Sequence, residues 1–387
     1  MNELKFQKDD FKKLDLKDLS ENETPAYGVS MRKRIMLRFL RNKLAMVSLI
    51  VIILLLTASF VIPHFYPYEL NDQNLKMRDI GPVFKAYRMS DGRKYHFSVD
   101  MKVWLIKDTD GFMIPMNQVA ENLKKKEIYF EYGDAKVMLN YNNKRLKLTD
   151  MNGQKGEAIT VFNKEHIFGT DALGRDLFIR VLYGVQVSLE IAVIATLVNV
   201  LIGVSYGCIA GFSGGNIDNV MMRAVDIIGN IPLLLYVILL MVVIGAGLKS
   251  IIIAMSSVFW IGMARLVRGQ VLSLKNMEYI QAAKSIGTGN AKIILGHLLP
   301  NILDQIILSL ILAIPNAIFT EAFLSFIGLG IQEPLTSLGS LCNAGMDVLV
   351  TYPYRMFFPA VFICAIIFCF NFIGDGLRDA MAVRMAR

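Results

Sequence analysis

The chain has 387 residues, 54% of them hydrophobic, and a mean hydropathy of +0.45. This composition lies outside the usual range of soluble globular proteins and indicates a polytopic membrane protein. The formal net charge is +8, but the basic residues lie beside apolar runs and in no nucleic-acid-binding motif. Nucleic acid is therefore not expected as a partner.

The N-terminal segment, residues 1–43, is mostly polar and becomes basic over MRKRIMLRFLRNK, residues 31–43. This last part predicts an amphipathic helix lying on the lipid surface, which either positions the first span or only supplies topogenic charge. About forty mostly polar residues precede the first apolar run, so a cleavable signal peptide is not expected. The N-terminus is expected in the cytoplasm.

The first membrane span is predicted at residues 44–64, an uncharged run long enough to cross the hydrocarbon layer. Five more spans, within a permease core at 166–374, are expected at residues 187–210, 231–247, 250–266, 302–323 and 357–373. Pro232 lies near the start of the third, and Pro315 inside the fifth is expected to kink or unwind it. The basic loop 270–300 and the tail 375–387 then lie in the cytoplasm.

Residues 65–165 form a polar insert between the first two spans, and the first span is expected to carry it out of the cytoplasm. Runs of β-favouring residues alternate there with turn signals such as Asn152-Gly153. We predict a small β-rich or α+β unit with one short helix at 116–126. It is either a structural insertion or a contact for an extracytoplasmic partner.

No catalytic or metal-binding constellation is present in the sequence. The four histidines are scattered, HExxH and CxxC are absent, and so is the GxxxxGK[ST] loop that cradles nucleotide phosphates. The chain is therefore expected to bind no metal or cofactor and not to be an enzyme. Glu190, Asp304 and Glu321 fall near predicted span ends and are interpreted as interface carboxylates that reach water or a basic neighbour, which disfavours ion coupling.

The polar segment EYIQAAKSIGTGNAKIILGHLLPN, residues 278–301, separates two apolar runs. A helix is predicted at 277–286, with Tyr279, Ala283 and Ile286 along one face and Gly287 as its stop. A second turn is expected at 290–297, and Pro300 ends the loop. If energy for transport comes neither from ions nor from nucleotide bound here, it must arrive through another protein, and this segment is the expected contact.

These residues carry a family resemblance. Ala282-Ala283, Gly287 and Leu299-Pro300 resemble the EAA loop of ABC-importer permeases, and the extended segment is similar to the second membrane subunit of the oligopeptide, dipeptide and nickel permease family. Three further motifs are similar in the same order: FGTDALGRD at 168–176, EAFLSFIGLGI at 321–331 and FNFIGDGLRDA at 370–380.

The resemblance implies an all-α polytopic protein with six transmembrane helices of the type I ABC importer fold, in a bacterial cell membrane. Its implied partners are a homologous permease, two ATPases that bind ATP and Mg, and an extracytoplasmic solute-binding protein. Together they would import oligopeptides or dipeptides by alternating access. A permease for nickel or another small solute, an ion-coupled secondary transporter, and a membrane scaffold or receptor remain alternatives.

The resemblance also implies two groups of site residues. The ATPase-coupling contact would comprise Glu278, Tyr279, Gln281, Ala282, Ala283, Gly287, Leu299 and Pro300. An outer gate or scoop, or simply fixed helix ends, would be formed by Gly169, Thr170, Asp171, Gly174, Arg175, Asp176, Glu321, Ser325, Gly328 and Gly330.

The sequence departs from the family pattern at three places, and there the residue roles known for the family do not carry over directly. Gln281 stands where a glutamate is usual, so an ion pair with the ATPase would be lost or replaced by a weaker hydrogen bond. The tail reads Ala382-Val383 where Asp-Pro is common. The insert at 65–165 is much longer than the usual first outer loop.

Overall fold

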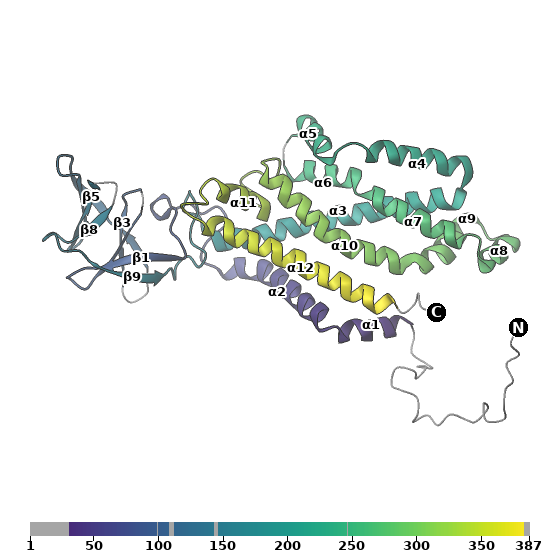
Figure 1. Ribbon diagram of the computed structural model, residues 1–387, viewed down its shortest axis with the longest axis horizontal. Helices are drawn as coiled ribbons and strands as arrows, with labels where there is room; N and C mark the ends of the chain where they lie inside the picture. The colour runs from purple at the N-terminus through teal and green to yellow at the C-terminus, as the bar shows by residue number, and fades with distance from the viewer. Residues whose placement is uncertain (1–30, 99, 108–111, 143–145, 246, 383–387) are drawn as a thin grey trace, which may run out of the picture.

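The computed structural model describes residues 31–98, 100–107, 112–142, 146–245 and 247–382. Most of the N-terminal segment and the end of the tail beyond Ala382, where the sequence departs from the family pattern, lie outside this range. A β-rich unit stands at one end of a long helical bundle (Figure 1).

The bundle is built on α3, which packs against helices that come before and after it in sequence. The helices are α1 (Met31–Arg41), α2 (Lys43–Phe65), α3 (Leu177–Ser213), α4 (Gly215–Gly229), α5 (Leu233–Ile244), α6 (Leu248–Val258), α7 (Trp260–Leu274), α8 (Glu278–Ser285), α9 (Asn290–Ile293), α10 (Leu299–Phe326), α11 (Leu338–Met346) and α12 (Tyr354–Ala382). A buried apolar cluster joins α3 to α2, α6, α10, α11 and α12.

Within the described residues, five helical stretches are long and apolar enough to cross a membrane: 43–65, 177–213, 248–274, 290–326 and 354–381. They contain five of the six predicted spans and generally extend beyond them. The predicted amphipathic helix is also present, as α1. The longer bounds follow from capping: α3, for example, begins where the Asp176 side chain accepts a hydrogen bond from the Ile179 N–H at 2.9 Å.

The prediction that residues 231–247 form the third span by themselves is wrong. The apolar residues of this range form α5, which has only 12 residues and is too short to cross the hydrocarbon alone. It follows α4 at a bend of 80°, with Pro232 at the N-cap of α5. The two helices make one broken span or a re-entrant segment, and the proline marks the break because it has no N–H to continue the α4 ladder.

The fifth predicted span also differs in two respects. Helical structure begins upstream at Asn290, in α9, and passes through a π-helical segment, Ile294–Leu298, into α10. Pro300 therefore lies in the first turn of α10 and does not end a loop. Pro315 is buried inside α10, and the helix continues through it without unwinding.

In the β-rich unit the described residues form nine strands in two antiparallel sheets. The strands are β1 (Val83–Arg88), β2 (Lys94–Phe97), β3 (Val103–Ile106), β4 (Met113–Pro115), β5 (Asn117–Asn122), β6 (Glu127–Tyr132), β7 (Ala135–Asn140), β8 (Lys147–Thr149) and β9 (Glu157–Phe162). One sheet has the order β4-β3-β2-β1-β9 and the other β5-β6-β7-β8. The helix predicted at 116–126 is wrong: β5 occupies most of it, because pairing with β6 overrides weak local preference.

Two apolar cores hold this unit. The first gathers side chains from both sheets, with Tyr95 and Leu139 fully buried. The second surrounds Trp104, whose indole N–H donates to the Lys76 carbonyl at 3.0 Å. Because β1 and β9 pair along their whole length, with Val83 opposite Phe162, the unit leaves and returns to the bundle at one place.

Candidate functional site

The polar segment after α7 folds as predicted into the short helix α8. The helix ends in a Schellman motif: Thr288 N–H donates to the Ala283 carbonyl at 3.0 Å, and Gly287 N–H donates to the Lys284 carbonyl at 2.9 Å. Gly287 has φ +80°, a conformation that costs a residue with a side chain about 1–2 kcal/mol. The predicted stop at Gly287 is confirmed.

The two faces of α8 differ. Ile280 and Ala283 are 0% and 6% exposed, whereas Tyr279, Ala282 and Ile286 are exposed. The predicted face of Tyr279, Ala283 and Ile286 is therefore wrong for Ala283, which packs inward with Ile280, three residues away. Glu278 and Gln281 are exposed as well. Four of the eight residues predicted to contact the ATPase, Glu278, Tyr279, Gln281 and Ala282, therefore lie together on the exposed side of α8.

The inner face of α8 joins the ends of three long helices. Ile280 and Ala283 belong to an apolar cluster with residues of α3, α7 and α10, among them Cys208, Val271 and Ile302. Lys284 Nζ lies 5.3 Å from the centre of the Phe212 ring at the end of α3. Leu299 is half-buried and Pro300 exposed in the first turn of α10. Direct packing thus connects α8 to the ends of these three helices.

The loop before α3 contains a buried ionic cluster. Asp171 accepts from Arg175 Nε at 2.7 Å and from Arg180 Nη1, and Glu333, in the loop after α10, accepts from Arg175 Nη2 at 2.6 Å and Arg180 Nη2 at 3.3 Å. Burial raises the pKa of Asp171, but the charges of Arg180 and Arg175 and the Arg175 backbone N–H outweigh it. The net pKa is below its usual value.

The rest of this motif ties the β-rich unit to the bundle. Thr170 Oγ1 donates to the Met77 carbonyl at 2.5 Å, and the Tyr354 hydroxyl donates to the Thr170 carbonyl at 2.8 Å. Gly169 and Gly174 form the turns of the same loop. A Cβ at Gly174 would lie 1.9 Å from the Asn74 carbonyl oxygen, so only glycine permits this approach.

Asp176, at the end of this loop, makes two sets of hydrogen bonds. Besides capping α3, its carboxylate lies 2.8 Å from His166 Nδ1 and accepts from the Tyr66 hydroxyl at 3.3 Å. Burial, and then the Asp176 charge, raise the pKa of Tyr66 well above its ordinary value. Tyr66 therefore stays protonated as the donor. We name residues 166–176 with Arg180 and Glu333 the outer junction.

The second group of predicted gate residues surrounds Glu321. Its carboxylate is fully buried in α10 and accepts from Ser188 at 2.9 Å and Ser325 at 2.8 Å. The Ser337 hydroxyl, at the N-cap of α11, lies 3.3 Å from Ser325 Oγ. Gly328 and Gly330 lie in the loop that follows α10.

The predicted interface carboxylates are thus partly wrong. Glu321 does not reach water or a basic neighbour, because three serines surround it. Glu190 is exposed but lies well inside α3 and not near its end, because the helix begins ten residues before the predicted span. In the described part of the chain, no group of three or more His, Cys, Asp or Glu side chains is arranged to hold a metal ion.

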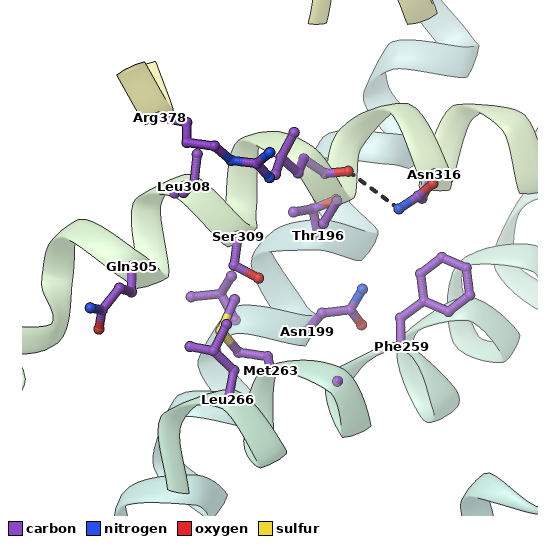
Figure 2. A pocket seen from close by; sticks show the side chains of 14 residues that line it. Thr196, Asn199, Phe259, Met263, Leu266, Gln305, Leu308, Ser309, Asn316 and Arg378 are labelled. Carbon is purple, nitrogen blue, oxygen red and sulfur yellow. Dashed lines mark hydrogen bonds between the residues drawn. The ribbon is translucent and has the colours of Figure 1, made fainter. Parts of the chain in front are cut away.

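A pocket of about 520 Å³ lies between α3, α7 and α10, with Arg378 of α12 at its edge (Figure 2). Thr196 and Asn199 of α3 are 1% and 4% exposed. The Thr196 hydroxyl and both polar atoms of the Asn199 carboxamide have no hydrogen-bond partner among the described residues. Neither residue was predicted from the sequence, because only charged side chains within the spans were taken to indicate function. Two polar side chains three positions apart in an apolar run are nevertheless a readable signal.

Comparison with known proteins gives two family matches. Residues 203–387 match the binding-protein-dependent transport system inner membrane component, and residues 30–82 match the N-terminal transmembrane domain of oligopeptide transport permease C. Between them lie residues 83–202, which include the nine strands described above.

Similar proteins include two permeases of Bacillus subtilis (strain 168). The oligopeptide transport system permease protein OppC is 50% identical over 225 residues, which cover 58% of this chain and 74% of the relative. The dipeptide transport system permease protein DppC is 49% identical over 224 residues, covering 58% and 70%. Among solved structures, the inward-facing MetNI methionine ABC transporter aligns with 54% of this chain and 96% of its own at 19% identity and a TM-score of 0.45, too low to bear on conformation. On its sequence similarities, the chain belongs to the binding-protein-dependent transport system inner membrane components, among the oligopeptide and dipeptide transport permeases.

Proposed function

We propose that this chain is a permease subunit of an ATP-driven peptide importer in a bacterial cell membrane. It forms the translocation path with a homologous permease, while two ATPase subunits that bind ATP and Mg supply the energy and a solute-binding protein delivers the peptide. The names of the similar permeases, which are oligopeptide and dipeptide transporters, support peptide over nickel as the solute.

The observation that carries the proposal is the construction of α8. Its exposed side offers Glu278, Tyr279, Gln281 and Ala282, and its buried side is fixed to α3, α7 and α10. An ATPase that moved α8 would move these three helices as well, which is the requirement for alternating access without a catalytic residue in this chain. Gln281 makes the contact less dependent on charge than a glutamate would.

In this arrangement α8 and both chain ends face the cytoplasm, and the β-rich unit stands outside. The helix α8 and the β-rich unit lie at opposite ends of the bundle (Figure 1), which supports this orientation. The outer junction then fixes the outer end of α3. The cluster formed by Glu321 with Ser188, Ser325 and Ser337 fixes the outer end of α10 beside α11. We assign them to the outer gate as its rigid frame, since their charged and hydroxyl groups are already paired.

Two neighbouring alanines test the coupling contact. In the complex assembled with its ATPases, Ala282→Cys labelled with benzophenone-4-maleimide is expected to photocrosslink to an ATPase subunit, because Ala282 is exposed; the maleimide adds to the introduced thiol and the excited benzophenone inserts into a C–H bond of the neighbouring subunit. Ala283→Cys is the matched control, since the same side chain one position later is buried. The unchanged chain, with its four native cysteines free in the structure, sets the background.

The expected result is an ATPase adduct with Ala282→Cys well above that background and none with Ala283→Cys. Equal crosslinking of both variants, or of neither in a complex that retains its ATPases, would contradict the assignment of α8.

A further inference from the structure

The polar side chains that line the pocket between α3, α7 and α10 belong neither to the coupling residues nor to the outer gate. We propose that this pocket is a transit site for the peptide backbone, in which Thr196 and Asn199 hydrogen-bond to amide groups of the peptide as it crosses. The proposal rests on the peptide-import function above and adds to it the residues that contact the solute.

The first argument is the state of the polar side chains. A buried hydroxyl or carboxamide without a partner costs about 1–3 kcal/mol, and more where lipid surrounds the protein. Thr196 and Asn199 are one helical turn apart on one face of α3, near its middle. Figure 2 shows the Asn199 carboxamide and the Ser309 hydroxyl directed into the space between α3 and α10. Gln305 Oε1 is a further buried acceptor without a partner among the described residues.

The second argument is the match between the lining and a peptide backbone. A carboxamide supplies two donors and an acceptor, and a hydroxyl supplies one donor and accepts as well, so together they satisfy both the N–H and the C=O of a peptide unit. Such pairing is independent of the peptide's side chains, as the transport of varied sequences requires. Arg378 stands at the edge; its side chain is 59% exposed and its Nη1 lies 3.9 Å from Asp375 Oδ1, a long, exposed ion pair that a terminal carboxylate of the peptide would compete with.

The lining also argues against a metal ion as the occupant. Its 14 residues, all in the described part of the chain, include no Asp, Glu, His or Cys, the side chains that hold divalent transition metals. The volume of about 520 Å³ lies within the range of small-molecule sites and accommodates a short stretch of peptide.

The test is uptake of carbon-14-labelled trialanine and tetraalanine by the complete importer in proteoliposomes. Thr196→Val and Asn199→Leu remove the polar atoms and keep the number and branching of the side-chain heavy atoms. Gly262→Leu fills the pocket from α7, where a Cβ would meet no heavy atom within 4 Å. Thr57→Val is the matched control: Thr57 is an exposed threonine of α2 whose hydroxyl donates to the Ile53 carbonyl at 2.7 Å, and it does not line the pocket.

We expect Asn199→Leu to lower the uptake rate about tenfold, the effect of losing one hydrogen bond of about 1.4 kcal/mol. Thr196→Val and Gly262→Leu are expected to lower it as well, while Thr57→Val retains wild-type uptake. The thermal unfolding midpoint of Asn199→Leu should equal or exceed that of the wild type, because an apolar side chain of similar shape replaces a buried unpaired amide.

Wild-type uptake in both Asn199→Leu and Gly262→Leu would overturn the transit site and leave peptide import standing. A lowered unfolding midpoint in Asn199→Leu would also overturn it, by showing that the carboxamide serves the fold. Failure of the wild-type importer to take up either peptide would instead overturn the import function, and the transit site with it.

Discussion

Asp171 is the residue on which the outer junction depends most. Its carboxylate accepts from two buried guanidinium groups, those of Arg175 and Arg180. In Asp171→Asn these cations lose their buried anion and keep only the exposed Glu333, and breaking such a buried pair from one side costs about 3–5 kcal/mol. We expect a correspondingly lower free energy of unfolding, measured by thermal or denaturant unfolding of the chain in detergent.

Glu333→Gln is the control for this prediction. Glu333 contacts the same two arginines, but its side chain is 59% exposed, so its removal should cost less than about 1 kcal/mol. A cost for Glu333→Gln as large as that for Asp171→Asn would show that the burial of Asp171 is not what makes the cluster stabilising.

Ionisation of the Asp171 carboxyl group should also make the stability of the chain depend on pH in the acid range. The pKa of Asp171 is lowered in the folded chain, so its ionised form stabilises the fold above the unfolded-state value of about 3.9. This contribution is lost as the pH falls from about 4 through the folded pKa. Unfolding midpoints measured from pH 6 downwards should decline below about pH 4, and Asp171→Asn should decline less steeply; an identical slope in the two proteins would contradict the assignment.

Residue-scale prediction from sequence succeeded where a local rule decides the position. Gly287 stops α8 because a left-handed residue must follow the helix there. It failed for Ala283 and Glu321, whose burial depends on helices far away in the chain. The Thr196 and Asn199 pair was readable from the spacing, but what faces it across the pocket comes from α10, more than a hundred residues later.

At the scale of the element, α8 separates a packing face from a contact face, and the two alanines of the motif lie on different sides. Ala283→Arg places a charge in the buried cluster and should destabilise the chain by at least about 2 kcal/mol. Ala282→Arg projects into solvent in the isolated chain, so it should leave stability within about 0.5 kcal/mol and block the ATPase contact.

Unfolding of the isolated chain and ATP-driven peptide uptake by the assembled importer, measured on both variants, check this prediction. The combination expected for Ala282→Arg is normal unfolding with strongly reduced uptake. If uptake with Ala282→Arg matched the wild type, the exposed face of α8 would not be the coupling surface.

Among the long helices, apolar runs of about twenty residues predicted the position of every span except the third. Hydropathy alone could not show that α4 and α5 meet at 80°, because a turn at Ile231-Pro232 leaves the composition of the run unchanged. The β-rich unit was predicted as a class, but not β5, whose residues have no strong strand preference and depend on β6 for pairing.

At the scale of the whole molecule, the β-rich unit is joined to the bundle at a single place and has two cores of its own. We predict that a fragment comprising residues 74–166 folds without the bundle into a soluble β protein. Circular dichroism should show a β spectrum and one cooperative thermal transition. A fragment without such a transition would mean that the outer junction, and not the internal cores, holds the sheets together.

We expect this permease to move peptide only when ATPase subunits drive it through α8. The most direct measurement is uptake of labelled peptide into proteoliposomes that contain this chain with its partner permease, with and without the two ATPases and ATP, in the presence of the binding protein. Uptake is expected only when ATPases and ATP are both present. Peptide uptake by the permeases alone, at the rate of the complete importer, would contradict this expectation.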